Sequence, residues 1–137
     1  MKIKPIIIFT GQKKSIFLEI FFKSLKLNKF KSPIVLVGCF KSFKKEMKKF
    51  NILKKIRLID VKNLQDQRLD NKNFNLIDIK IPSNKKSKKN NNYNHIKKGF
   101  DICFKILKSG YSDKFINGPI NKSQFLNKKY LGITEYI

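Results

Sequence analysis

Acidic residues and arginine are scarce in this sequence, whereas lysine is abundant. The 137 residues include 32 basic and 9 acidic ones, which gives a formal net charge of +23, and only Arg57 and Arg68 are arginines. Lysine, asparagine, isoleucine and phenylalanine are encoded by A/T-rich codons, so genomic base composition is enough to explain the charge. Nucleic-acid-binding proteins favour arginine for its bidentate contacts. Nucleic acid is therefore a disfavoured partner, and a small basic module that binds RNA or another polyanion is the alternative.

Cysteine and histidine are also rare. Cys39 and Cys103 are far apart and form no C-x-x-C pair, so the sequence predicts neither a zinc site nor a disulfide framework. We expect both to behave as small apolar residues, Cys103 on the buried face of a helix. His95 is the only histidine. It follows a polar segment, so we expect an exposed side chain, and one histidine cannot build a metal site.

No apolar run approaches the length of a transmembrane helix. The run at Ile6–Phe9 is short and basic residues follow it closely, which is unlike a secretory signal peptide. We therefore expect a cytoplasmic protein with no membrane partner. The length of the chain is enough for one domain with a hydrophobic core.

Short apolar runs alternate with amphipathic segments along the chain. Such an alternation predicts an α/β fold, a mainly parallel sheet with helices on both faces. Pro82 ends the fourth run, whose alternating pattern is typical of a half-exposed strand. The expected strands are 6–9, 34–38, 56–61, 76–81 and 114–117, and the expected helices are 16–27, 43–50, 96–108 and one from residue 119.

Two segments carry more detailed expectations. In helix 16–27, Glu19 and Lys23 are spaced for an ion pair on the exposed face. The same periodicity assigns five residues to the core, namely Ile16, Phe17, Ile20, Phe21 and Leu25. The segment 83–94 consists almost entirely of lysine, asparagine and serine, so we expect a flexible surface loop there.

Glycines stand where the first, second and last apolar runs end. In parallel sheets ligands bind beyond the carboxyl ends of strands, which is where Gly11, Gly38 and Gly118 fall. Pro119 suits the first turn of a helix, whose free N–H groups attract anions, and Lys122 adds a positive charge. There is no G-x-G-x-x-G and no P-loop, so a Rossmann or Walker nucleotide site is not predicted.

The residues around Gly118 also carry a resemblance to a known family. INGPINK at 116–122 and GITEY at 132–136 resemble the GPxxK…GHTE region of the 4-hydroxythreonine-4-phosphate dehydrogenase family, the enzymes of pyridoxal phosphate synthesis. TGQKKSIFLEI at 10–20 occupies the place of that family's GDPAGIGPE-type turn. Gly11 and Glu19 match the turn, whereas Gln12 replaces its aspartate. The resemblance covers nearly the whole chain but only the first part of the family's length.

The resemblance implies an incomplete fold of the isocitrate/isopropylmalate dehydrogenase type, with residues 1–137 forming the N-terminal portion of a two-domain enzyme. It implies oxidation of 4-phosphooxy-threonine by NAD or NADP in a homodimer. A divalent metal (Zn, Mg or Co) would polarise the alcohol oxygen. The implied substrate-binding residues are Thr134, Ile133, Gly118, Asn121 and Lys122.

Ile133 stands where the family has the histidine of the GHTE turn, and Thr134 stands where the family has its threonine. The family's three metal-binding histidines and most of its nicotinamide contacts belong to a region that this sequence does not include. We therefore assign no catalytic or metal-binding residue here, and we expect a fragment that is inactive alone. A decayed remnant without activity is a further possibility.

Overall fold

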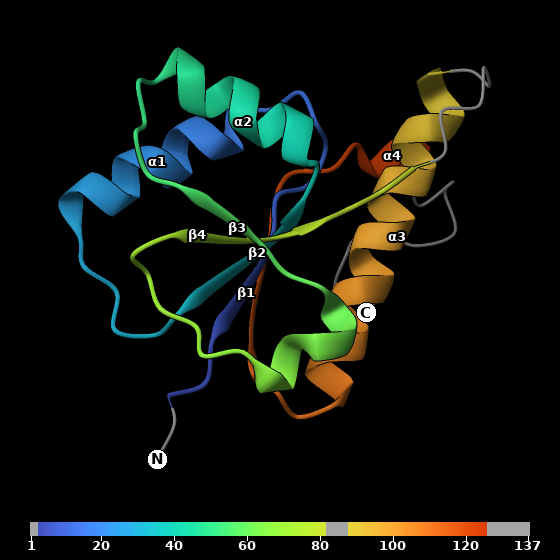
Figure 1. Cartoon of the computed structure of the whole chain (residues 1–137). Coiled ribbons are helices and arrows are strands. Elements are labelled where there is room, and N and C mark those ends of the chain that lie inside the picture. Colours follow the sequence, from blue (N-terminus) through green and yellow to red (C-terminus); the bar gives the residue numbers. More distant parts are fainter. Residues whose placement is uncertain (1–2, 82–87, 126–137) are drawn as a thin grey trace.

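The computed structural model describes residues 3–81 and 88–125 (Figure 1). Strands and helices alternate in the order that the sequence predicts. The elements are β1 (Ile6–Phe9), α1 (Phe17–Leu27), β2 (Ile34–Gly38), α2 (Phe40–Lys49), β3 (Ile56–Leu58), the 3-10 helix η1 (Val61–Asp66), β4 (Phe74–Asp78), α3 (Lys88–Lys108), β5 (Lys114–Asn117) and α4 (Lys122–Phe125).

The described strands form one sheet in the order β3-β4-β2-β1-β5, and every neighbouring pair is parallel. The expected α/β architecture is thereby confirmed. β1 and β2 lie inside the sheet and have helices over both faces, which explains why their sequences are continuous apolar runs. β3 and β5 are the outer strands and are the more exposed ones.

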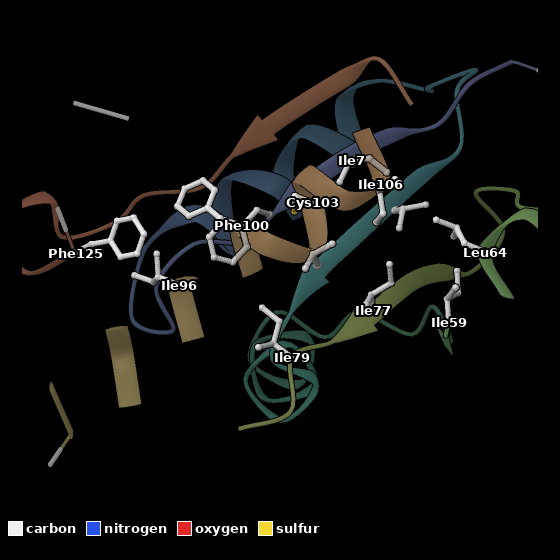
Figure 2. Packing of buried hydrophobic residues seen from close by; sticks show 13 residues of the cluster. Ile7, Ile59, Leu64, Ile77, Ile79, Ile96, Phe100, Cys103, Ile106 and Phe125 are labelled. Carbon is white, nitrogen blue, oxygen red and sulfur yellow. The ribbon is translucent and has the colours of Figure 1, made fainter. Parts of the chain in front are cut away.

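Side chains from alternate strand positions fill two separate cores. On one face, Ile7 and Phe9 of β1 pack with α3, η1 and α4. On the other face, Ile8 packs with α1 and α2. Figure 1 shows α1 and α2 on one side of the sheet and α3 and α4 on the other. In Figure 2, Phe100 and Cys103 of α3 lie within the first of these cores.

α1 faces the sheet differently from the expectation. Ile16 is 68% exposed and Ile20 is 55% exposed, whereas Leu18, Phe21 and Phe22 are buried. The ring of Phe22 packs against two others, with centroid distances of 5.5 Å to Phe43 and 5.9 Å to Phe74. Aromatic packing therefore sets the rotation of this helix about its axis. The expected ion pair is confirmed, because Lys23 Nζ lies 2.8 Å from Glu19 Oε1.

β4 begins two residues earlier than expected and lies inside the sheet instead of half-exposed. Asn75 makes the start of this strand look polar, yet its side chain is only 1% exposed. Its Nδ2 donates hydrogen bonds to the carbonyl oxygens of Ile34, at 3.0 Å, and Asp70, at 2.7 Å. Both bonds satisfy the donor side of this buried amide, whereas its Oδ1 has no hydrogen-bond partner within the described residues.

α3 is longer than expected, because it begins at Lys88. Residues 88–94 are therefore helical instead of part of the expected 83–94 loop, and residues 83–87 lie outside the described part. Lysine is a good helix former, and packing against α4 stabilises this first part of α3. The Tyr93 ring lies 5.6 Å from that of Phe125 in α4, and Ile96 is buried.

Candidate functional site

β1 and β5 are neighbours whose following helices lie on opposite faces of the sheet. After β1 the chain enters α1, which packs with one core, and after β5 it enters α4, whose Phe125 packs with the other. In open α/β sheets such a divergence marks the switch point, the crevice position beyond the carboxyl ends of two parallel strands at which ligands bind. Gly11 follows β1 and Gly118 follows β5, so both lie at this position.

The backbones of Gly11 and Gly118 lie in direct contact. The N–H of Gly118 donates to the carbonyl oxygen of Phe9, at 2.6 Å, and the N–H of Gln12 donates to that of Pro119, at 2.9 Å. A Cβ on Gly118 would lie 2.9 Å from the nitrogen of Gly11, a distance that real side chains do not adopt. Gly11 also has a φ of +78°, which favours glycine. Both positions therefore require glycine.

Two further strand ends border the same edge. Gly38 closes β2, and a Cβ there would lie 3.0 Å from Cγ2 of Thr10. Asp78 closes β4, and its Oδ1 accepts a hydrogen bond from the N–H of Phe40, at 2.8 Å, at the start of α2. The expectation that Gly11, Gly38 and Gly118 gather at the carboxyl ends of strands is thereby confirmed. The sequence interpretation did not single out Asp78.

His95 is buried at this edge, so the expectation of an exposed side chain is wrong. The residue is 1% exposed, and its Nε2 lies 3.2 Å from the carbonyl oxygen of Gly11. A carbonyl only accepts, so Nε2 carries the proton and Nδ1 is an unprotonated acceptor. Nδ1 has no hydrogen-bond partner within the described part of the chain. The peptide unit between Gly11 and Gln12 is thus held on both sides, by His95 and by Pro119.

Burial lowers the pKa of His95 to about 4, because a charged imidazolium is poorly solvated there. The positive charge of Lys13 lowers the pKa further. The hydrogen bond to Gly11 and the negative charge of Asp78 act in the opposite direction. At neutral pH the imidazole is therefore uncharged.

A hollow of about 10 Å³ lies between the loop after β1 and the start of α2. The residues around it include the polar Thr10, Lys13, Ser15, Ser42 and His95 and the apolar Leu18 and Phe43. Lys13 is exposed, so the hollow reaches solvent on that side. This volume is comparable to the space that one water molecule needs, about 10–15 Å³.

The predicted substrate-binding residues are only partly described. Gly118 is buried, and Asn121 and Lys122 are exposed in the turn that follows it. α4 begins at Lys122, three residues later than the Pro119 start that we expected, and the N–H of Phe125 bonds to the carbonyl of Asn121 at 3.0 Å. Pro119 therefore belongs to the turn. Thr134 and Ile133 lie outside the described residues, as does the whole of GITEY.

The described residues do not fit a divalent metal. Residues 3–81 and 88–125 contain no group of three or more His, Cys, Asp or Glu side chains that could hold one. In the same two stretches, none of the helices is both long enough and apolar enough to cross a membrane.

A larger hollow, of about 310 Å³, lies at the opposite end of the sheet, where β2 and β4 begin. Phe21, Ile34 and Phe74 contribute apolar surface to it. Asn71 lies at its border and closes the neighbouring loop, because its Nδ2 donates to the carbonyl oxygen of Ser32 at 2.8 Å. This hollow is at the amino ends of the strands, so the crevice between β1 and β5 is the better candidate site.

The chain has an α/β fold, with a five-stranded parallel sheet and its switch point between β1 and β5. Solved structures that share the fold are 4-hydroxythreonine-4-phosphate dehydrogenases. The enzyme from Burkholderia phymatum matches with a TM-score of 0.73 and 19% identity, over 97% of this chain and 42% of its own. A Salmonella typhimurium protein, provisionally assigned as the same enzyme, matches with a TM-score of 0.72 and 21% identity, over 96% and 42%. The Klebsiella pneumoniae enzyme matches with a TM-score of 0.67 and 21% identity, over 94% and 42%.

The fold implied by the sequence resemblance is therefore confirmed, and the chain spans about 42% of the length of these enzymes. No protein-family model matches the sequence, and no curated protein matches it.

Proposed function

We propose that this chain is the N-terminal portion of a 4-hydroxythreonine-4-phosphate dehydrogenase and forms one wall of its substrate cleft. The complete enzyme would oxidise 4-phosphooxy-threonine with NAD or NADP in pyridoxine 5'-phosphate synthesis. One observation carries the proposal. The turn that contains the GPxxK motif, residues 118–122, lies at the switch point between β1 and β5, and solved dehydrogenases of this name share the sheet.

The turn after β5 is suited to a phosphorylated substrate. Gly118 has no side chain, so this turn packs directly against the backbone of Thr10 and Gly11, which fixes its position at the carboxyl end of β1. Lys122 and Asn121 are exposed and close to it in sequence, and they offer a positive charge and an amide to phosphate oxygens. In this proposal Thr134 and Ile133 supply further substrate contacts.

The remaining chemistry would come from elsewhere in the complete enzyme. A metal would polarise the reacting alcohol, and the described residues offer no ligand set for it. We propose that the nicotinamide cofactor is likewise bound mainly by the part of the enzyme outside this chain. The complete enzyme would be a cytoplasmic homodimer, and this chain alone would be inactive.

The proposal is tested by titrating the chain with 4-phosphooxy-L-threonine and following its backbone amide resonances by NMR. Binding should perturb the amides of Gly11, Gly118 and Lys122. Lys122→Gln should weaken binding about fivefold, the effect of losing one exposed charge pair. Lys26→Gln is the matched control, because Lys26 is equally exposed but lies in the last turn of α1, away from the crevice.

Perturbations scattered over exposed lysines, or equal weakening by both substitutions, would contradict the proposal. Such a result would indicate unspecific attraction of a phosphate to a basic surface.

A further inference from the structure

The larger hollow, at the amino ends of β2 and β4, has the size of a small-molecule site. Its volume of about 310 Å³ is at the lower end of the range for ligand pockets, about 300–1,000 Å³. A compound with one ring fits such a space, whereas a dinucleotide cofactor is too large for it. The hollow lies at the other end of the strands from Gly118, so the proposed substrate cleft does not account for it.

Apolar side chains from three segments form much of its wall. Phe21 and Leu25 come from α1, and Ile34 and Phe74 are the first residues of β2 and β4. Phe30, in the loop between α1 and β2, is 40% exposed, so its ring is open to a ligand. Aromatic rings pack well against one another. The wall therefore suits a ligand with an aromatic body.

The charge at the hollow is positive. The described residues that line it include two lysines, Lys29 and Lys54, and no aspartate or glutamate. Nζ of Lys54 lies 4.8 Å from the centroid of the Phe74 ring. Burial lowers the pKa of Lys54, because an ammonium group is poorly solvated there, and the negative charge of Asp70 acts in the opposite direction. No described carboxylate forms an ion pair with Lys54, so this partly buried cation lacks a counter-ion.

The two buried or half-buried asparagines at the border are committed to the fold. Asn71 donates from Nδ2 to two carbonyl oxygens of the loop before β2, and its Oδ1 accepts from the N–H of Ile34 at 2.9 Å. Asn75 donates within the sheet, and its Oδ1 is buried away from any ligand. Lys54 and Lys29 are therefore the donors that an anion would meet.

A carboxylate suits these two lysines better than a phosphate does. Each of its two oxygens can accept from one ammonium group. A phosphate dianion would need further donors, because a charge left uncompensated beside an apolar wall is costly. We propose that the hollow binds a small aromatic monocarboxylate, with its ring against the apolar wall and its carboxylate at Lys54. This site is separate from the proposed substrate cleft and does not depend on it.

The probe that tests the proposal is 3-phenylpropanoate, titrated into the chain and followed by its backbone amide resonances. The amides of Lys54 and Phe74 should shift and saturate, whereas those of Gly118 and Lys122 should stay in place. The uncharged analogue 3-phenylpropanamide should bind about three- to tenfold more weakly, the effect of one partly buried charge contact. Inorganic phosphate, which has charge but no ring, should give no saturable shift at the hollow.

Three substitutions separate this contact from general attraction to a basic surface. Lys54→Gln should make the acid and its amide bind equally weakly. Lys55→Gln is the matched control and should retain the preference for the acid, because Lys55 is the next residue, is exposed and does not line the hollow. Phe30→Ala should weaken the binding of both compounds about two- to tenfold, the effect of one aromatic contact.

Several outcomes would overturn the proposal. One is a preference for the acid that survives Lys54→Gln or is lost equally in Lys55→Gln. Others are shifts spread over exposed lysines, or no saturable shift at the hollow. Phosphate binding as tight as that of 3-phenylpropanoate would overturn the aromatic carboxylate as the ligand class. None of these results bears on the proposed function, which the separate titration with 4-phosphooxy-L-threonine tests.

Discussion

Gly11 and Gly118 lie backbone against backbone, with a hypothetical Cβ on Gly118 only 2.9 Å from the nitrogen of Gly11. The contact joins the loop after the first strand to the turn after the last one. Each glycine was identified from the sequence as the end of an apolar run, but their mutual contact depends on β5 pairing with β1. The crevice therefore depends on the sheet order as much as on the two residues.

Replacing Gly11 by alanine should lower the free energy of unfolding more than the same change at Gly110. Both glycines have a positive φ, +78° and +77°, so both alanines are strained by about 1–2 kcal/mol. Only Gly11 also has backbone atoms in the way, with the carbonyl carbon of Gly118 2.7 Å from the added Cβ, whereas nothing lies within 4 Å at Gly110. Overpacking should add about 1–3 kcal/mol to the cost of Gly11→Ala.

Urea unfolding of the two variants beside the wild-type chain measures this difference. Equal losses of stability would mean that the two turns are not in contact.

The stability of the chain should fall as the pH is lowered through the range in which free histidine titrates. His95 has a pKa of about 4 in the fold, below its ordinary value of 6.5, so the unfolded chain takes up the proton first. The contribution of the uncharged His95 side chain to stability is fully present above pH 6.5, declines below it and is lost by about pH 4. Between about pH 7 and about pH 5 the loss should be about 2 kcal/mol, measured by denaturant unfolding at each pH.

His95→Gln provides the control, because glutamine retains a donor toward Gly11 and does not titrate. The unfolding free energy of this variant should change little between about pH 7 and about pH 5, where most carboxylates remain ionised. A slope that persists in His95→Gln would show that another group is responsible.

The alternation of strands and helices could be predicted from the sequence, because inner parallel strands must be apolar on both faces. The same rule placed Gly11 and Gly118 at the carboxyl ends of strands. Predictions from local periodicity were wrong where contacts between distant parts of the chain determine the structure. Asn75 looks unsuitable for an inner strand until its hydrogen bond to Ile34 in the neighbouring strand is known, and the extent of α3 depends on contacts with α4.

His95 was missed for a similar reason. It directly follows the polar segment 83–94, and that position indicated an exposed side chain. A signal was nevertheless available, because His95, Gly99 and Cys103 are spaced by four residues and share one face of a helix. Cys103 was expected on the buried face, and it is 0% exposed. Extending that face by two turns would have placed His95 against the sheet.

The rotation of α1 predicts unequal effects of two substitutions. Phe22→Ala should lower the free energy of unfolding by about 3–5 kcal/mol, because the ring is 2% exposed and packs with four other phenylalanines. Ile20→Ala should change it by less than about 0.5 kcal/mol, since Ile20 is 55% exposed. Thermal or urea unfolding measures both. Comparable losses would instead support the helix face that the sequence periodicity suggested.

Binding to RNA should be weak and should disappear as salt is added. Exposed lysines lie on α1 and α2, over one face of the sheet, and also on α3, over the other, so the positive charge is not concentrated on one surface. Arginine, the residue suited to bidentate recognition, is almost absent.

Filter binding to mixed-sequence RNA should show a steep decline in affinity between about 50 and about 200 mM salt, because binding then rests on counterion release alone. Retention of tight binding at the higher salt concentration would revive the polyanion-binding alternative, and competition by 4-phosphooxy-L-threonine would place that binding in the crevice.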